Sequence, residues 1–192
     1  MNPRRLYGPV VLGTLAAGGV AVFAASRTWA HATVTADGVP SAPIDVSGTD
    51  AVGIVSALAL VVVAAALAVL AASARVRRGV GALVVLVSVI AVVVIITAAG
   101  ALDDAVASAV HDSPAFIGNN TPDEVSHGVW RWVCLVAFLA AASVGVVIAR
   151  FGAYWPTMGR KYDAPAAHTP VETIETEADI WKALDDGRDP TQ

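Results

Sequence analysis

The side chains best suited to chemistry in this sequence are three histidines and three acids: His31, His111, His127, Asp112, Asp123 and Glu124. Together they could form a metal site, which requires ligands that converge at a defined geometry. These residues are scattered over two polar segments, and no His-x-x-His or His-Glu-x-x-His spacing places two of them on one helix face. We therefore expect no metal site and interpret the group as a solvated acidic surface.

Covalent catalysis has equally little support in the sequence. No Ser/His/Asp arrangement, phosphate-binding glycine loop or nucleotide fingerprint is recognisable. Cys134 is the single cysteine, which excludes an intramolecular disulfide and a cysteine-based metal cluster within one chain. The sequence predicts that the protein is not an enzyme, and we expect no cofactor and no nucleic-acid partner.

The elements that would position these groups are four long apolar stretches. Residues 6–25, 51–74 and 79–102 contain no charged side chain, and a fourth stretch, uncharged over 132–149, is expected to span 130–151. Each stretch approaches or exceeds the ~20 apolar residues with which a helix crosses a bilayer core of about 30 Å. The sequence therefore predicts an all-α membrane protein, with a four-helix transmembrane bundle over residues 1–155 and a polar tail over 156–192.

The basic residues predict how these spans are oriented. One set flanks the spans on one side of the membrane: Arg4, Arg5, Arg75, Arg77, Arg78, Arg150, Arg160 and Lys161. The connections at 26–50 and 103–131 hold eight acids but only Arg27 and Arg131. Because Lys and Arg resist translocation, we predict a multi-pass protein of the plasma membrane with both termini in the cytoplasm.

Aromatic side chains agree with these boundaries, since amphipathic rings prefer the headgroup level. At the outer interface we expect Trp29, Trp130 and Trp132. At the inner interface we expect Tyr7 and Phe151, and as anchors Tyr154, Trp155, Arg160 and Lys161.

The first span has a competing interpretation as a cleaved signal peptide, because a basic start and an apolar run precede small residues near Ala24 and Ala30. Its uncharged run is about twenty residues, longer than the roughly 7–15 of a signal-peptide core. Retention is therefore the favoured interpretation, and cleavage would leave three spans.

Small residues at four-residue spacing predict close contacts between the helices of the bundle or, alternatively, with another membrane protein. They form three sets: Gly13, Ala17 and Ala21; Gly53 and Ala57; Ala141, Gly145 and Ala149. No ionisable side chain lies within the uncharged stretches, which argues against an ion-coupled transporter. A channel or carrier for an uncharged, apolar ligand stays open.

Two outer connections show weaker patterns. Residues Thr33–Thr35 favour a strand and are followed by the turn signal Asp37-Gly38, so a short hairpin is expected. Residues 103–110 could extend the third span by an amphipathic turn or two.

The tail carries the most specific polar sequence. A linker over 163–170 precedes a short helix at about 177–186, with Ile180, Trp181 and Leu184 as its apolar side chains. Such a short helix is marginal alone in water. We therefore expect these three residues to dock against the membrane, an inner loop or a partner protein; the alternative is that the tail is only a stabilising stub.

Two tail motifs carry a family resemblance. The residues concerned are Trp155-Pro156, Met158, Arg160 and Tyr162, then Trp181, Ala183-Leu184-Asp185, Gly187 and Asp189-Pro190-Thr191. With the four-span layout and the Arg27-Thr28-Trp29 exit from the first span, they resemble the tryptophan-associated transmembrane protein family of actinobacteria. The family takes its name from genes that lie among those for tryptophan biosynthesis, so the resemblance implies a pathway context and supplies no mechanism.

Three functions are compatible with these features. The first is a non-enzymatic accessory or scaffold protein that acts through its tail. The alternative is a carrier or sensor for tryptophan or another small apolar or aromatic molecule. An enzyme acting on lipid or quinone has the least support, because no nucleophile is paired with a base.

Overall fold

The computed structural model describes residues 7–36, 39–113, 125–155 and 185. The chain divides into two compact units, Met1–Thr157 and Met158–Gln192. Of the second unit only Asp185 is described, and it is helical and exposed. The linker, the predicted helix with Ile180, Trp181 and Leu184, and the anchors Arg160 and Lys161 lie outside the described residues.

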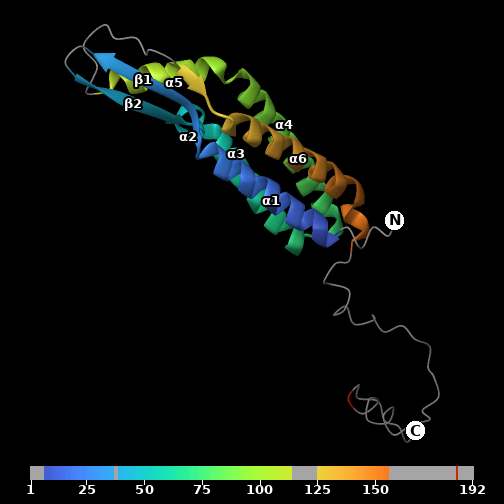
Figure 1. Cartoon of the computed structure of the whole chain (residues 1–192). Helices are drawn as coiled ribbons and strands as arrows, with labels where there is room; N and C mark the ends of the chain where they lie inside the picture. Colours follow the sequence, from blue (N-terminus) through green and yellow to red (C-terminus); the bar gives the residue numbers. More distant parts are fainter. Residues whose placement is uncertain (1–6, 37–38, 114–124, 156–184, 186–192) are drawn as a thin grey trace, which may run out of the picture. The chain divides into compact units, whose positions relative to one another are not determined.

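Four helices dominate the first unit: α1 (Tyr7–Ala25), α3 (Gly53–Ala71), α4 (Ala74–Thr97) and α6 (Trp130–Phe151). Within the described residues, these are the helices long and apolar enough to cross a membrane. They lie side by side in a bundle (Figure 1). The prediction of four helical spans is confirmed. The third of them, α4, begins and ends five residues before the expected stretch at 79–102.

Each helix of the bundle packs against two neighbours, in the cyclic order α1–α3–α4–α6. Glycines allow the closest approaches, since they let helix backbones meet without intervening side chains. A Cβ atom on Gly81 of α4 would lie 2.9 Å from the Gly145 carbonyl oxygen of α6, and one on Gly18 of α1 would lie 3.1 Å from the Val63 backbone nitrogen of α3.

The predicted small-residue sets are therefore only partly used. Ala17, Ala21, Ala141 and Gly145 are buried between helices, as expected. By contrast, Gly53 and Ala57 are exposed on α3, and their predicted contact is wrong for this unit. Spacing alone does not specify which face of a helix meets a neighbour.

A small sheet covers one end of the bundle, called the sheet end below. It is antiparallel in the order β2–β1–β3, with β1 at Thr28–Ala36, β2 at Val39–Ser47 and β3 at Val125–His127. The predicted hairpin is confirmed by the pairing of β1 with β2. The prediction of an all-α fold was incomplete, because the hairpin and β3 form a three-stranded sheet. β3 was not predicted, since it is only three residues long.

Two further helices lie beside the sheet at the sheet end: α2 (Gly48–Ala51) and α5 (Ala99–His111). The sheet buries one face by strand alternation, and α5 supplies Leu102, Val106 and Val110 at four-residue spacing against it. The strand residues buried by this alternation are Ala30, Ala32, Val34, Ile44 and Val46, and Trp29 of β1 is buried as well. They belong to one continuous core with the helices of the bundle.

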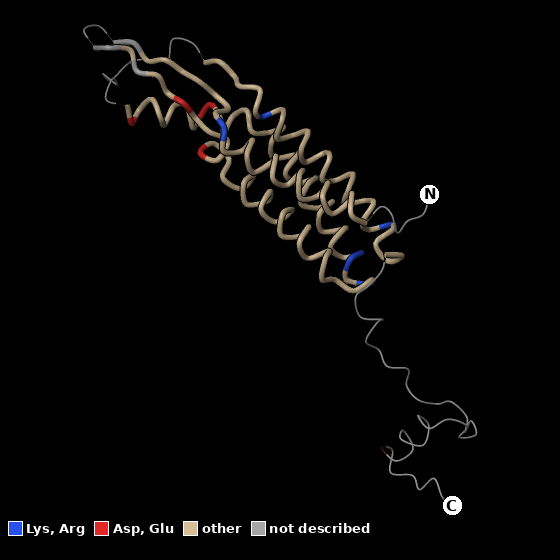
Figure 2. The backbone as a smooth tube through the Cα atoms, turned by 60° about the horizontal axis from the view of Figure 1, so that its bottom comes forward, with Lys and Arg blue, Asp and Glu red and all other residues tan. Residues whose placement is uncertain are grey.

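The charged residues of the first unit lie at its two ends (Figure 2). Among the described residues of this unit, the acids lie at the sheet end and the long helices are free of charge in between. The helix α4 begins at Ala74, although the charge pattern placed the span at 79, because Arg75, Arg77 and Arg78 occupy its first turns. α5 follows α4 after a break at Ala98 and corresponds to the expected extension at 103–110.

Candidate functional site

The histidines considered as metal ligands do not converge. His31 of β1 instead pairs with Asp45 of β2, its cross-strand neighbour, with the Nδ1 and Oδ1 atoms 2.5 Å apart. Ser126 of β3 is the opposite cross-strand neighbour of His31. Among the described residues no three His, Cys, Asp or Glu side chains form a group that could hold a metal ion.

No sequence pattern predicts that Asp45, His31 and Ser126 are neighbours, because the strand register brings them together. Their order resembles a catalytic triad, yet more than half of the His31 and Asp45 side chains is exposed. No hydrogen bond joins His31 to Ser126 among those of the described residues. We interpret the His31–Asp45 contact as a cross-strand pair that supports the sheet.

The junction between bundle and sheet is built around Trp29. Its ring was expected at a membrane interface but is fully buried, and its Nε1 donates to the Ala24 carbonyl oxygen at the end of α1, at 2.9 Å. The Gly48 nitrogen of α2 donates to the Arg27 carbonyl, and the Gly128 nitrogen donates to the Trp29 carbonyl. A register shift in β1 between Thr28 and Ala30 accompanies this inward turn of Trp29.

Arg131 forms a second link at the sheet end. Its Nε and Nη2 atoms donate to the Ile95 carbonyl at 3.2 and 2.9 Å, and Nη2 also donates to the Ile96 carbonyl. These carbonyls belong to the last turn of α4, where helix acceptors lack intrahelical partners. Arg131 therefore caps α4 at the point where the chain turns into α5.

At the opposite end, called the tail end below, Arg77 is almost completely buried. Its Nε donates to the Val69 carbonyl of α3 at 3.1 Å, and its guanidinium lies 5.1 Å from the Tyr7 ring centroid. The Tyr7 ring meets Trp155 edge to face at 5.5 Å. Arg77 thus contacts the end of α3 and the start of α1, whereas the charge pattern placed it in the short connection between the second and third spans.

The two described anchors differ from one another. Tyr154 is 62% exposed, as a ring at a membrane surface would be, whereas Trp155 is 3% exposed and packs near Val10, Val69 and Ile148. The Trp155 Nε1 has no hydrogen-bond acceptor among the described residues. Trp155 thus closes the core of the bundle at the tail end.

Within the spans, the buried polar side chains bond to their own surroundings. The Thr14 hydroxyl donates to the Val10 carbonyl at 2.8 Å, and the Cys134 thiol donates to the Ala21 carbonyl at 3.7 Å. The buried Ser88 hydroxyl has no partner among the described residues. These groups offer no acid, base or ion pair between the two ends.

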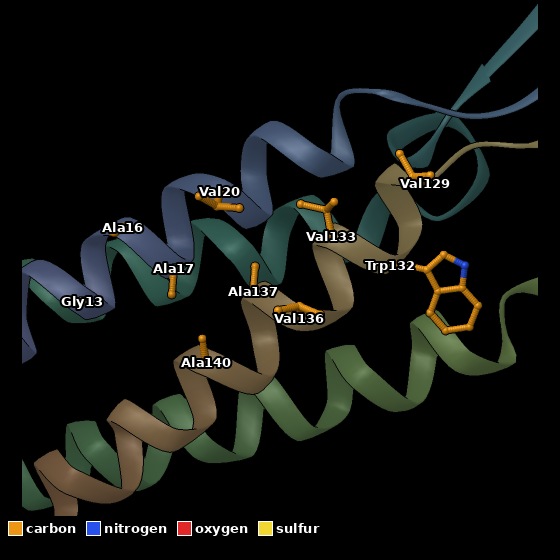
Figure 3. A pocket seen from close by; sticks show the side chains of 10 residues that line it. All are labelled: Gly13, Ala16, Ala17, Val20, Val129, Trp132, Val133, Val136, Ala137 and Ala140. Atoms are coloured by element: carbon orange, nitrogen blue, oxygen red, sulfur yellow. The ribbon is translucent and has the colours of Figure 1, made fainter.

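A groove of about 610 Å³ runs between α1 and α6. Figure 3 shows side chains from both helices around it. The groove was not predicted from the sequence. It forms where small residues of α1 face α6, and this pairing of helices is set by the tertiary structure. Its lining is apolar: Gly13, Ala16, Ala17, Val20, Val129, Trp132, Val133, Val136, Ala137 and Ala140.

Comparison with known proteins gives one family. The family model described as tryptophan-associated transmembrane protein matches residues 11–191, which is nearly the whole chain. No curated protein matches the sequence.

Proposed function

Because the chain belongs to the tryptophan-associated transmembrane protein family, we propose that it is a non-enzymatic accessory or scaffold protein of the plasma membrane. It binds a protein partner through its C-terminal tail, and the family name supports a link to tryptophan biosynthesis. The match covers the tail as well as the spans, so the tail belongs to the family's common architecture.

The observation that carries this proposal is the composition of the bundle interior. Between the two ends of the bundle the buried side chains are mainly Ala and Val. The Thr14 hydroxyl and the Cys134 thiol there donate to nearby backbone carbonyls. Coupled transport and proton relays ordinarily use ionisable groups at this depth. A packed, uncharged interior is better suited to holding a membrane position than to moving a charged substrate.

The proposal includes an orientation. Both termini lie in the cytoplasm and the sheet end lies outside, since Arg75, Arg77, Arg78 and Arg150 gather at the tail end. The first span is retained, because Ala17, Ala21 and Ala24 of α1 are part of the main core. The tail is then available to cytoplasmic partners.

A pull-down in mild detergent tests the proposal. The intact protein is compared with Trp181→Ala and with a chain truncated after Tyr162. Ile180, Trp181 and Leu184 supply the apolar surface of the expected tail helix, so we expect a stoichiometric partner with the intact protein and its loss with both variants.

The control is Leu60→Ala, which removes an exposed apolar side chain from α3, away from the groove, and leaves the tail intact. Equal membrane insertion of all variants shows that loss of the partner is not loss of the protein. If every variant retains the same partner, or none has one, tail docking is wrong.

The alternative is a carrier or sensor for tryptophan or another small apolar or aromatic molecule, and the groove between α1 and α6 is the observation that favours it. Its volume lies within the range of ~300–1,000 Å³ typical of small-molecule sites. Its apolar lining offers no partner for an amino acid's ammonium and carboxylate groups. Unchanged tryptophan uptake and efflux in a deletion strain would contradict a tryptophan carrier.

A further inference from the structure

The groove between α1 and α6 is about as long, measured along the helices, as one membrane leaflet is thick. Its α6 wall runs from Val129 to Ala140, which is about 16 Å at the helical rise of ~1.5 Å per residue. The hydrocarbon core of a bilayer is about 30 Å thick. The groove starts at the sheet end and stops near the middle of the bundle, so a helix that crosses the whole membrane would leave half of its length outside it.

The groove points toward one charged side chain. On α1, Ala16 and Val20 line the groove, and Phe23 and Arg27 continue the same stripe at spacings of three and four residues. The helical turn persists this far, because the Arg27 nitrogen donates to the Ala24 carbonyl. Arg27 therefore lies beyond the outer end of the groove, on the same side of α1.

Arg27 is held in place by aromatic rings. Its guanidinium lies 4.2 Å from the centroid of Phe23 and 5.9 Å from that of Trp130 on α6. Phe23 and Trp130 meet edge to face at 5.6 Å, which joins the two helices at the end of the groove. Arg27 is exposed and forms no ion pair with a described residue, whereas the nearby Arg131 already donates to the carbonyls of α4.

We propose that this groove binds one acyl chain of an anionic phospholipid whose phosphate pairs with Arg27. The apolar lining accommodates the chain, the groove length matches one leaflet, and a cation stands where the headgroup begins. A guanidinium recognises phosphate through several donors at once. Trp132, 61% exposed at the groove wall, suits the boundary between chain and headgroup. The site is independent of the proposed tail docking, because it does not involve the tail, and a lipid there would exclude the alternative small-molecule ligand from the same groove.

Native mass spectrometry of the full chain tests the headgroup contact. The protein is equilibrated with phosphatidylglycerol and phosphatidylcholine of identical acyl chains, and retained lipids are counted. One basic residue near an anionic headgroup changes affinity by about fivefold. We expect preferential retention of phosphatidylglycerol and an approximately fivefold loss of that preference in Arg27→Gln.

The control is Arg150→Gln, which removes an exposed arginine at the tail end and should leave the preference intact. If Arg27→Gln retains the same preference as the unmodified protein, the headgroup assignment is wrong.

The acyl-chain contact is tested separately with a photoreactive diazirine placed in the chain of phosphatidylglycerol. Adducts should concentrate on residues 13–20 and 129–140, and the double variant Ala16→Leu/Ala140→Leu should abolish them by filling the groove. The control Ala57→Leu adds the same bulk to an exposed position of α3. Adducts spread evenly over all helices would mean annular lipid only, and a co-purified apolar molecule in the groove in place of lipid would also overturn the proposal.

Discussion

At the scale of single residues, Trp29 decides how the sheet joins the bundle. Its indole lies against Gly48, where a Cβ atom would come within 2.7 Å of Nε1. Its Nε1 donates to the Ala24 carbonyl at the end of α1, which also accepts a hydrogen bond from the Arg27 nitrogen. One side chain thus contacts α1, the sheet and α2, and its position depends on a neighbour without a side chain.

Gly48→Ala should therefore destabilise the protein. The added methyl group overlaps the buried indole, and overpacking of this kind costs about 1–3 kcal/mol in unfolding free energy. Thermal unfolding in detergent, followed by circular dichroism, measures the effect. Gly100→Ala is the control, since nothing lies within 4 Å of a Cβ atom there; equal stability of the two variants would contradict the role given to Gly48.

At the scale of elements, the contact between α4 and α6 is the most extensive in the bundle. Without a hydrophobic drive between helices in lipid, association depends on close packing. Gly81 and Gly145 provide it, since a Cβ atom on Gly145 would lie 3.0 Å from both Val84 and Val85. The backbones of these two helices therefore approach more closely than side chains would permit.

Gly81→Ala should force α4 and α6 apart, because its Cβ atom would meet the backbone of Ala149 and Gly145, which cannot rotate away. We expect a lower unfolding temperature and, for Cys134 on α6, fully buried in the native protein, faster maleimide labelling. Gly79→Ala lies one half-turn away with open space around it. It should be neutral or stabilising by up to about 1 kcal/mol through helix propensity, and the prediction fails if the two variants behave alike.

Arg131 controls a second element boundary, the turn from α4 into α5. Arg131→Leu leaves the Ile95 and Ile96 carbonyls without their donors, at a cost of about 1–3 kcal/mol. Amide hydrogen exchange should rise over 98–111, while the middle of α4 stays protected. Arg150→Leu, at the other end of α6, should leave this segment unchanged; unchanged exchange in Arg131→Leu would show that the cap is dispensable.

At the scale of the whole first unit, the separation of charge is the basis of the proposed orientation. The tail end carries basic residues and the sheet end carries the described acids (Figure 2). In a Cys134→Ala background, Thr33→Cys on the exposed face of β1 should react with an impermeant maleimide in intact cells. Tyr154→Cys, at the tail end, should react only after permeabilisation. The reverse pattern would place the sheet in the cytoplasm.

The sequence by itself determined the membrane domain and its family. In lipid, the backbone N–H and C=O groups of a long uncharged stretch must form hydrogen bonds within a helix. The four helical spans therefore followed from composition alone. The hairpin was equally local, since strand-forming residues beside Asp37-Gly38 were sufficient to predict it. The tail helix with Trp181, Leu184 and Ile180 stays a prediction.

Only the tertiary structure decided which residues meet. Sequence patterns assigned Arg77 to the short connection between two spans and Trp29 to the outer membrane interface. Both side chains are buried, because neighbouring elements pack over them. The third strand, the Arg131 cap and the groove also depend on residues distant in sequence. In an uncharged helix rich in Ala and Val, every face is apolar enough to pack against a neighbour. The periodicity of the sequence therefore does not indicate which face is buried, and the contacts between helices decide it.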